Sequence, residues 1–280
     1  MRKISLLILV AIFCTFISCT KEKSDPKPDP TPDPPVATLD ADATKFIENA
    51  KISDTVQKQA IQNLVKQLKD SALWSKFTAI YPFIGGTAAS TKLNLKDPRD
   101  LDEAFRLTYH GNPVIASTGV LFPTTADYAD THLYDSTMVY NDNAISYFSR
   151  TQNTVSGYDM GCSDWYAPYN QLTIYHESNG SAYFGFNIGT PTPTNTVGLF
   201  VLSSTANKLF LSANGITTNF KDTTPTNKYT GYPMLIGWCQ DAEAVGKREC
   251  AFSSIGKGLT EREAATLYNI VAKYQEGLKR

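Results

Sequence analysis

The sequence predicts a mainly β domain, a sandwich or a barrel, with helices at both of its ends. Short apolar or alternating runs fill residues 83–259, and Gly, Asn, Thr, Ser or Pro interrupts them about every ten residues, which is typical of sandwiches and barrels. Helical spacing of apolar residues occurs only before and after this region, so we do not expect a parallel α/β sheet. With 280 residues, 42% of them hydrophobic, the chain can bury a sizeable core.

Residues 1–18 have the pattern of a bacterial signal peptide. Arg2 and Lys3 precede an apolar run of about 14 residues, which is shorter than the ~20 that cross a bilayer as a helix. Ser18 then precedes Cys19, and a small residue directly before a cysteine resembles the lipobox of bacterial lipoproteins. An ordinary secretory signal is the alternative, but no A-x-A-like cleavage site lies nearby. We therefore predict cleavage before Cys19 and lipidation of its sulfur.

Residues 19–38 are predicted to be a lipidated tether. Thr20 stands where an Asp would indicate retention in the inner membrane, and residues 19–23 are similar to a charged signal that sends some lipoproteins to the outer leaflet. Six prolines follow within residues 24–38 and exclude helix and sheet. An extended polyproline segment of this length reaches about 45 Å, although a spacer without fixed reach is the alternative. We expect attachment to the outer membrane at the cell surface, with the leaflet left open.

Residues 39–82 are predicted to be helical. One helix is expected over residues 42–50, and a second over residues 54–73, where Asp54 can cap the start. Trp74, Phe77 and Ile80 suggest a third helical turn before Pro82. The second helix carries one apolar stripe, formed by Val56, Ala60, Ile61, Leu64 and Leu68.

Within residues 83–259 we expect strands over residues 105–109, 171–175, 197–202, 208–211, 234–239 and 250–252. The runs at 197–202 and 208–211 are wholly apolar, as in strands buried on both faces. Residues 260–280 form a last helix, because Thr260 and Glu263 make a T-x-x-E capping box. Its apolar stripe needs a surface, which the first helices or the sandwich could supply; the stripe consists of Ala264, Leu267, Val271, Tyr274 and Leu278.

Three groups of segments resemble one family. They are residues 81–87 with 94–98 and 104–107, residues 128–131 with 145–150, and residues 252–260 with 263–268. They are similar to concanavalin-like, laminin-G-like jelly-roll domains of phage particles and bacterial surface lipoproteins. The resemblance implies a jelly-roll β-sandwich and implies little about activity, because such domains include both lectins and hydrolases.

The sequence shows no catalytic constellation. The only glutamates between residues 108 and 254 are Glu177, Glu243 and Glu249, and none has the strand spacing of a glycosidase acid pair. There is no G-x-S-x-G motif, and His110, His132 and His176 lack metal-ligand spacing, so we expect surface histidines or strand histidines with satisfied hydrogen bonds. We expect no enzyme, although acids from separate strands could still meet. The formal net charge of −1 without a basic patch argues against nucleic acid as a partner.

Cysteines and aspartates give two further expectations. Cys239 and Cys250 bracket a short charged loop and could form a disulfide between adjacent strands in the oxidising envelope. Equally, these two and Cys162 could be buried core thiols. Three other residues, Asp127, Asp130 and Asp159, have oxygen ligands for Ca²⁺, as some laminin-G-like domains do, but their spacing is not that of a calcium loop, and we expect no metal or cofactor.

The best candidate for a ligand site is a short aromatic loop with polar ends. Flat rings beside carboxylate and amide groups suit sugar recognition, because a ring covers the apolar sugar face while polar groups bind hydroxyls; Trp238, in an apolar run, is expected in the core instead. We predict non-catalytic binding of a glycan or surface ligand, with a structural or adhesion protein related to phage particle components as the second hypothesis and a carbohydrate-active enzyme as the third. The candidate residues are Asp164, Trp165, Tyr166, Tyr169 and Asn170.

Overall fold

The computed structural model describes residues 39–139, 141–164, 170–176, 181–184, 188–191, 195–221, 230–240 and 242–280. Every described residue belongs to one compact unit, Leu39–Arg280. The signal peptide, Cys19 and the proline-rich tether lie outside the described residues.

Two helices open the folded unit, as the apolar spacing predicts. Helix α1 spans Ala41–Asn49 and helix α2 spans Thr55–Asp70. Asp54 accepts a hydrogen bond from the Gln57 amide at 2.8 Å, which satisfies a donor that the first helical turn leaves unpaired. Val56 is 47% exposed, so it does not belong to the buried stripe, whose other predicted members are all buried: Ala60, Ile61, Leu64 and Leu68.

The prediction of a third helical turn before Pro82 is largely wrong. Only Trp74–Lys76 form a single 3₁₀ turn, η1, and the next residues form strand β1, Phe77–Tyr81. This strand pairs antiparallel with β15, Cys250–Gly256. A strand that is buried on both faces can carry apolar residues at a spacing of three, as a helix does. Strand β1 is such a strand, because Phe77 faces the helices and Tyr81 faces the other sheet.

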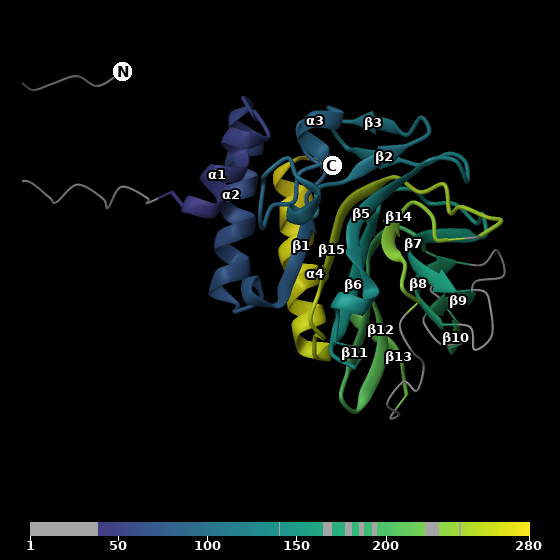
Figure 1. Ribbon diagram of the computed structural model, residues 1–280. Coiled ribbons are helices and arrows are strands. Elements are labelled where there is room, and N and C mark those ends of the chain that lie inside the picture. Colours follow the sequence, from purple (N-terminus) through teal and green to yellow (C-terminus); the bar gives the residue numbers. More distant parts are fainter. Residues whose placement is uncertain are drawn as a thin grey trace, which may run out of the picture. The chain divides into compact units, whose positions relative to one another are not determined.

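Two antiparallel sheets form a β-sandwich (Figure 1). We call them the helix-side sheet, with the order β13-β12-β11-β6-β15-β4-β3 and β1 attached to β15, and the outer sheet, with the order β10-β9-β8-β7-β14-β5-β2. The predicted sandwich with helices at both ends is therefore confirmed. The remaining strands are β2 (Thr108–His110), β3 (Val114–Ala116), β4 (Gly119–Leu121), β5 (Tyr128–Tyr134), β6 (Asn143–Ser149), β7 (Gly157–Asp164), β8 (Asn170–His176), β9 (Ser181–Phe184), β10 (Ile188–Pro191), β11 (Gly198–Thr205), β12 (Lys208–Ala213), β13 (Ile216–Lys221) and β14 (Pro233–Ile236).

Two apolar layers hold the sheets and helices together. One layer lies between the two sheets, and the other lies between the helix-side sheet and the helices. Strand β11 supplies both, because Phe200 faces the outer sheet while Leu199 and Val201 face the helices. Its continuous apolar run therefore marks a strand buried on both faces, as predicted.

The last helix, α4, spans Glu261–Gly277 and follows the predicted capping box. The Thr260 amide donates to Glu263 Oε2 at 2.7 Å, and the Glu263 amide donates to Thr260 Oγ1 at 3.2 Å. The helix packs against α2 and against β11 and β12, so both surfaces considered for its stripe contribute (Figure 1). Short 3₁₀ turns at Asp102–Ala104 and Asp135–Thr137 and the single-turn helix α3, Ala88–Thr91, complete the described elements.

Two strands are shorter than predicted for backbone reasons. The segment at 105–109 becomes strand only at Thr108, because Phe105 has a φ of 58° at the end of a 3₁₀ turn. Strand β14 ends at Ile236, because Gly237 has a φ of 91° and a Cβ there would lie 2.2 Å from the Phe122 ring. This turn carries Trp238 out of the strand and out of the core between the sheets.

Candidate functional site

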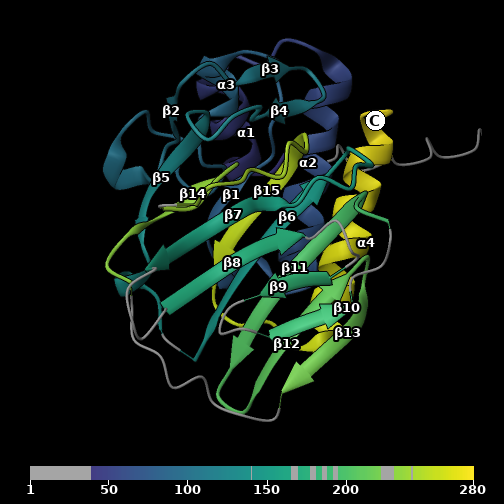
Figure 2. The ribbon, with the colours of Figure 1, turned by 90° about the vertical axis from the view of Figure 1, so that its right-hand side faces the viewer.

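The outer sheet has one face in the core and a second face that no helix in the described part of the chain covers (Figure 2). Side chains alternate between these faces along each strand. In β5, Ala129 and Leu133 belong to the core between the sheets, so Tyr128 projects from the outer face. In β8, Ile174 faces the core and Tyr175 faces outward.

Five rings cross this outer face from strand to strand, and we call them the aromatic row. They are His110 on β2, Tyr128 on β5, Trp238 after β14, Tyr158 on β7 and Tyr175 on β8. Ring centroids are 4.4 Å apart for His110 and Tyr128, 5.1 Å for Tyr128 and Trp238, and 4.5 Å for Tyr158 and Tyr175. Trp238 and Tyr175 both pack against the small cluster that contains Tyr158, which joins the two halves of the row.

One end of the row is half-exposed and has free polar atoms. We call His110, Tyr128 and Trp238 the row tip. Trp238 Nε1 donates to the Ala242 carbonyl at 2.8 Å, which fixes the indole. Neither the His110 nitrogens nor the Tyr128 hydroxyl makes a hydrogen bond within the described residues. The rings cover part of one another's faces, so a bound ligand would contact the ring edges and these polar atoms.

The other half of the row is covered by the chain itself. Tyr158 is 8% exposed, and burial raises the pKa of its hydroxyl well above the ordinary range, so it stays protonated. Its backbone amide donates to the Ala244 carbonyl at 3.3 Å, and its carbonyl accepts from the Gly246 amide at 2.9 Å. Residues 244–246 therefore lie against β7 at this point.

A buried charged cluster lies on the core side of the same strands. Side chains of Asp159, His176 and Arg248 are each 1% exposed. Asp159 Oδ1 lies 3.1 Å from Arg248 Nη1, and Asp159 Oδ2 lies 2.9 Å from His176 Nδ1. Burial alone would raise the pKa of Asp159, but the charge of Arg248 and the neighbouring His176 outweigh it and hold the pKa below its ordinary value.

The aromatic loop predicted as the ligand site lies mostly outside the described residues, which include neither Trp165 nor Tyr166 nor Tyr169. Its ends are placed: Asp164 ends β7 and Asn170 begins β8, and the two are direct partners in the ladder. They stand six residues from the row along β7, about 20 Å at the usual strand rise. Asp164 and Asn170 thus lie at the strand ends opposite to the row tip.

Trp238 was expected in the core, and this expectation needs correction, whereas His110 is a half-buried strand residue, in line with the expectation for the histidines. Trp238 is half-buried in the row tip, because the turn at Gly237 moves it off the strand. Alternation of polar and apolar residues around Tyr128 is the signal that points to an outward side chain. The pairing of Tyr128 with His110 follows only from the register between β2 and β5.

The disulfide considered for Cys239 and Cys250 is not formed, and all three described cysteines are buried free thiols. Cys250 starts β15 and faces the core between the sheets, whereas Cys239 lies in the small cluster on the outer face. The two residues therefore occupy different apolar clusters. Burial raises the pKa values of the Cys162 and Cys250 thiols, so these side chains behave as small core residues.

The three aspartates considered for Ca²⁺ have separate roles. Asp127 accepts from the amides of Asn112 and Thr124, which closes a turn, and Asp130 accepts from the His132 amide. Asp159 faces Arg248 and His176 as described. Within the described ranges, no group of three His, Cys, Asp or Glu side chains is placed to hold a metal ion.

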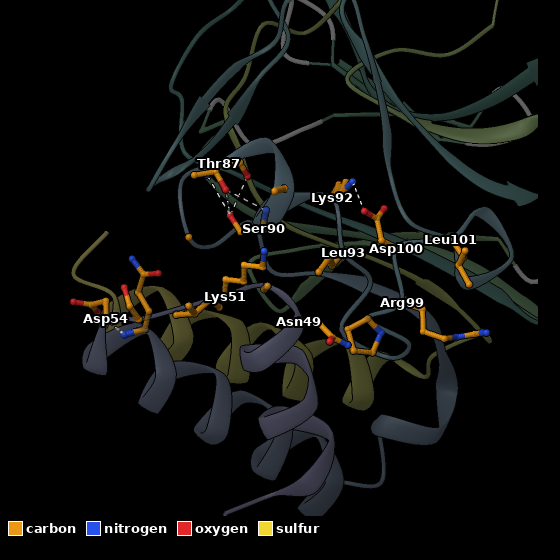
Figure 3. Close-up of a pocket in the computed structure, with 17 residues that line it drawn as sticks. Asn49, Lys51, Asp54, Thr87, Ser90, Lys92, Leu93, Arg99, Asp100 and Leu101 are labelled. Atoms are coloured by element: carbon orange, nitrogen blue, oxygen red, sulfur yellow. Dashed lines mark hydrogen bonds and ion pairs between the residues drawn. The ribbon is translucent and has the colours of Figure 1, made fainter.

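A groove of about 780 Å³ lies between the α1–α2 turn, the segment around α3 and residues 98–101 (Figure 3). Lys51 points across it toward Thr87 and Ser90. Lys92 pairs with Asp100 at 2.6 Å, so part of the charge in the groove is neutralised locally.

The described lining of this groove includes no aromatic ring, and its floor is made of aliphatic residues such as Ile52 and Leu93. Mixed charges, amides and hydroxyls on such a floor can hold polar ligands in many orientations but select none strongly. We therefore place the candidate site at the aromatic row. Among the described residues, no helix has the length and apolarity needed to cross a membrane.

No protein-family model matches this chain, and no curated protein matches its sequence. Solved structures do match its fold. A Trypanosoma rangeli sialidase in complex with sialic acid aligns with a TM-score of 0.51 at 9% identity, over 75% of this chain and 38% of the sialidase. A second structure of that sialidase, the covalent intermediate with 2,3-difluorosialic acid, has a TM-score of 0.52 at 10% identity, again over 75% and 38% of the two chains.

Domain 4 of an extracellular arabinanase from Geobacillus stearothermophilus, in complex with arabinotriose, aligns with a TM-score of 0.44 at 12% identity, over 69% of this chain and 98% of that domain. This chain spans less than two fifths of the length of the sialidases it matches. The two sialidase alignments, with TM-scores above 0.5, indicate a shared β-sandwich of two antiparallel sheets, and at 9–10% identity they show the fold alone.

Proposed function

We propose that the protein binds glycans without catalysis, through the row tip on the outer sheet. The observation that carries this proposal is the half-exposed row tip on the helix-free face, where His110 stacks on Tyr128 and Trp238 is tilted against it, and where the polar atoms of His110 and Tyr128 bond to no described residue. Tyr, Trp and His combine a rigid apolar body with a polar tip, so they give contact area at a small cost in conformational entropy. A sugar surface alternates C–H and O–H groups and suits such a mixed edge.

The fold supports this proposal only indirectly. Part of a sialidase that was crystallised with sialic acid shares the sandwich, so sialylated glycans belong among the first ligands to be tested. The segments that resemble laminin-G-like surface proteins imply the same kind of sandwich. Neither similarity identifies the sugar.

Two carboxylates close to Tyr128 in the chain, those of Asp127 and Asp130, are engaged in hydrogen bonds within the fold, which supports binding rather than hydrolysis. Glycosidases need two carboxyl groups that both face the scissile bond. Asp127 is 5% exposed and already accepts hydrogen bonds from the Asn112 amide and from Thr124. Asp130 accepts from the His132 amide at 2.7 Å. Both groups are therefore engaged in holding the strand and its turn.

We also propose that a lipid on Cys19 holds the domain on the outer membrane, with the proline-rich segment as a spacer. The support is the signal-like start of the chain and the residues around Cys19. A glycan-binding face carried away from the lipid surface could reach polysaccharide or host glycans.

A glycan array followed by calorimetry tests the binding proposal with three alanine variants. We expect Trp238→Ala and Tyr128→Ala each to weaken binding about tenfold or more, as truncation of a central aromatic contact does. Tyr134→Ala is the matched comparison, because Tyr134 is an exposed tyrosine at the other end of β5. Its affinity should equal that of the unmodified protein.

Trp165→Ala examines the alternative loop directly. Loss of binding in Trp165→Ala or Tyr134→Ala, with Trp238→Ala unaffected, would move the site to the opposite end of the sheet. A protein partner that stays bound in excess sugar would favour the structural or adhesion hypothesis instead.

A further inference from the structure

We infer that the buried cluster of Asp159, His176 and Arg248 is a positioning device that holds both ends of the segment from Gly237 to Arg248 and thereby sets Trp238 in the row tip. Its relevance to ligand binding rests on the proposed function, whereas the positioning itself does not. The Asp159 carboxylate and the Arg248 guanidinium are each 1% exposed, so they have lost their hydration and depend on each other for compensation.

Asp159 contacts both ends of the segment that carries Trp238. Its carbonyl accepts from the amide of Gly237, the first residue of the segment, at 2.7 Å. Its carboxylate lies 3.1 Å from Nη1 of Arg248, the last residue. One residue of β7 therefore fixes the two ends of a loop, which removes much of the conformational freedom of the residues between them. Trp238 directly follows the first anchored residue.

Arg248 is itself held from two further directions. Its Nη2 donates to the Val155 carbonyl at 2.6 Å, and its own carbonyl accepts from the Tyr147 hydroxyl at 2.7 Å. His176 lies against the other carboxylate oxygen of Asp159, and its ring packs edge-on against Phe200 at 4.6 Å. The carboxylate is thus oriented by groups from β8 and from the end of the loop.

The cluster and the row are adjacent along the chain. Tyr158 precedes Asp159, and Tyr175 precedes His176, so each strand places a ring outside and a charged or titratable side chain inside. The ladder between β7 and β8 shifts register between Tyr158 and Met160, as in a β-bulge, which allows Asp159 to point inward beside Met160. A displacement of Asp159 would therefore be transmitted to the row.

Gly246 shows how closely the loop fits over the cluster. A Cβ at this position would lie 2.1 Å from Asp159 Oδ1 and 2.3 Å from Arg248 Nη1. Even a methyl group would have to separate the ion pair. Gly246→Ala therefore perturbs the cluster while all three of its side chains remain.

The test measures the protection of Trp238 in the absence of any ligand. The chain has three tryptophans, so Trp74→Phe with Trp165→Phe leaves Trp238 as the single fluorophore. In this parent, Asp159→Asn with Arg248→Met removes the ion pair without leaving an unpaired buried charge. We expect cooperative unfolding to persist and acrylamide quenching of Trp238 to rise about twofold, as when a protected segment opens locally.

The control removes a half-buried ion pair elsewhere. Lys76 and Glu263 pair at 2.7 Å between η1 and α4, so Lys76→Met with Glu263→Gln should leave Trp238 quenching at the parent value. A cooperatively folded Asp159→Asn, Arg248→Met protein with parent-like quenching would overturn the inference. If that protein does not fold, Gly246→Ala replaces it, with the same expected rise, and unchanged quenching again overturns the inference.

Ligand binding is a separate readout. A glycan that the parent binds should bind more weakly to the variant with mobile Trp238. If no glycan binds the parent, the proposed function fails, but the quenching result still decides whether the cluster positions Trp238.

Discussion

His110 and Tyr128 are directly opposite each other on β2 and β5, and their rings stack with an interplanar angle of 14°. Strand β2 ends the order of the outer sheet, so His110 closes the aromatic row at that edge. Tyr128 lies between His110 and Trp238, and the ring centroids of Tyr128 and Trp238 are 5.1 Å apart. The position of each ring in the tip therefore depends on its neighbour.

We expect His110→Ala to weaken glycan binding by about three- to tenfold, because an aromatic pair contributes about 0.5–1.5 kcal/mol beyond its buried area. His110→Phe keeps the stack and removes the ring nitrogens. Calorimetry on both variants separates stacking from hydrogen bonding. Equal affinity in His110→Ala and the unmodified protein would remove His110 from the site.

Arg280 is predicted to stabilise the end of α4. Its guanidinium donates to four backbone carbonyls, at distances from 2.7 to 3.1 Å, which belong to Pro82, Phe83, Ser117 and Ala251. Arg280→Ala leaves these acceptors without their charged donor and should lower the free energy of unfolding by about 2 kcal/mol. Urea unfolding measures this change, and the exposed neighbour Lys279, as Lys279→Ala, is the control. An unchanged midpoint for Arg280→Ala would contradict the prediction.

The ion pair of Asp159 predicts a specific acid sensitivity. Because folding lowers the pKa of Asp159, its contribution to stability is present above the unfolded pKa of about 4 and is lost as the pH falls through the lower, folded value. The unmodified protein should therefore lose more stability between pH 5 and pH 2, roughly the window set by such a lowered pKa, than the Asp159→Asn, Arg248→Met protein. Urea unfolding across this range checks the difference. Parallel pH profiles would show that Asp159 is not responsible.

The buried thiols predict that stability does not depend on reducing agent. Cys162, Cys239 and Cys250 are free, so dithiothreitol should leave the melting temperature unchanged. Iodoacetamide should label all three only after unfolding, because a buried protonated thiol reacts slowly. Mass spectrometry of native and denatured samples makes the comparison. A mass two units lower than expected, restored by reduction, would reveal a disulfide.

The proposed anchor predicts that Cys19→Ser prevents attachment of radiolabelled palmitate and releases the protein from membranes. The sulfur of Cys19 is the acceptor that lipidation requires, and serine removes it. Ser18→Ala keeps a small residue before Cys19 and should still be labelled. Labelling that persists in Cys19→Ser would exclude this site.

Local patterns in the sequence were sufficient for several elements. The capping box at Thr260 and Glu263 forms as predicted, because its bonds join residues three apart. The stripe on α2, apart from Val56, and the doubly buried run of β11 are also confirmed, since the period of burial can be recognised within one segment. The turn of helix expected near Phe77 failed, because spacing alone does not distinguish a strand that is covered on both faces.

The candidate site was less accessible to sequence reasoning. Its three tip residues come from β2, from β5 and from the turn after β14, which are brought together by strand register. Trp238 looked like a core residue because it ends an apolar run, and only the φ of 91° at Gly237 takes it outward. No spacing rule connects position 110 with position 238.

By itself, the sequence determined that a mainly β domain lies between helices, because alternation and helical periodicity follow from local geometry. The tertiary structure decided which side chains meet. It joined His110 to Tyr128 and Trp238, and it placed Asp159 beside Arg248, 89 residues away in the chain. Contacts of this kind depend on sheet order and on loop anchoring, which are properties of the whole packed domain.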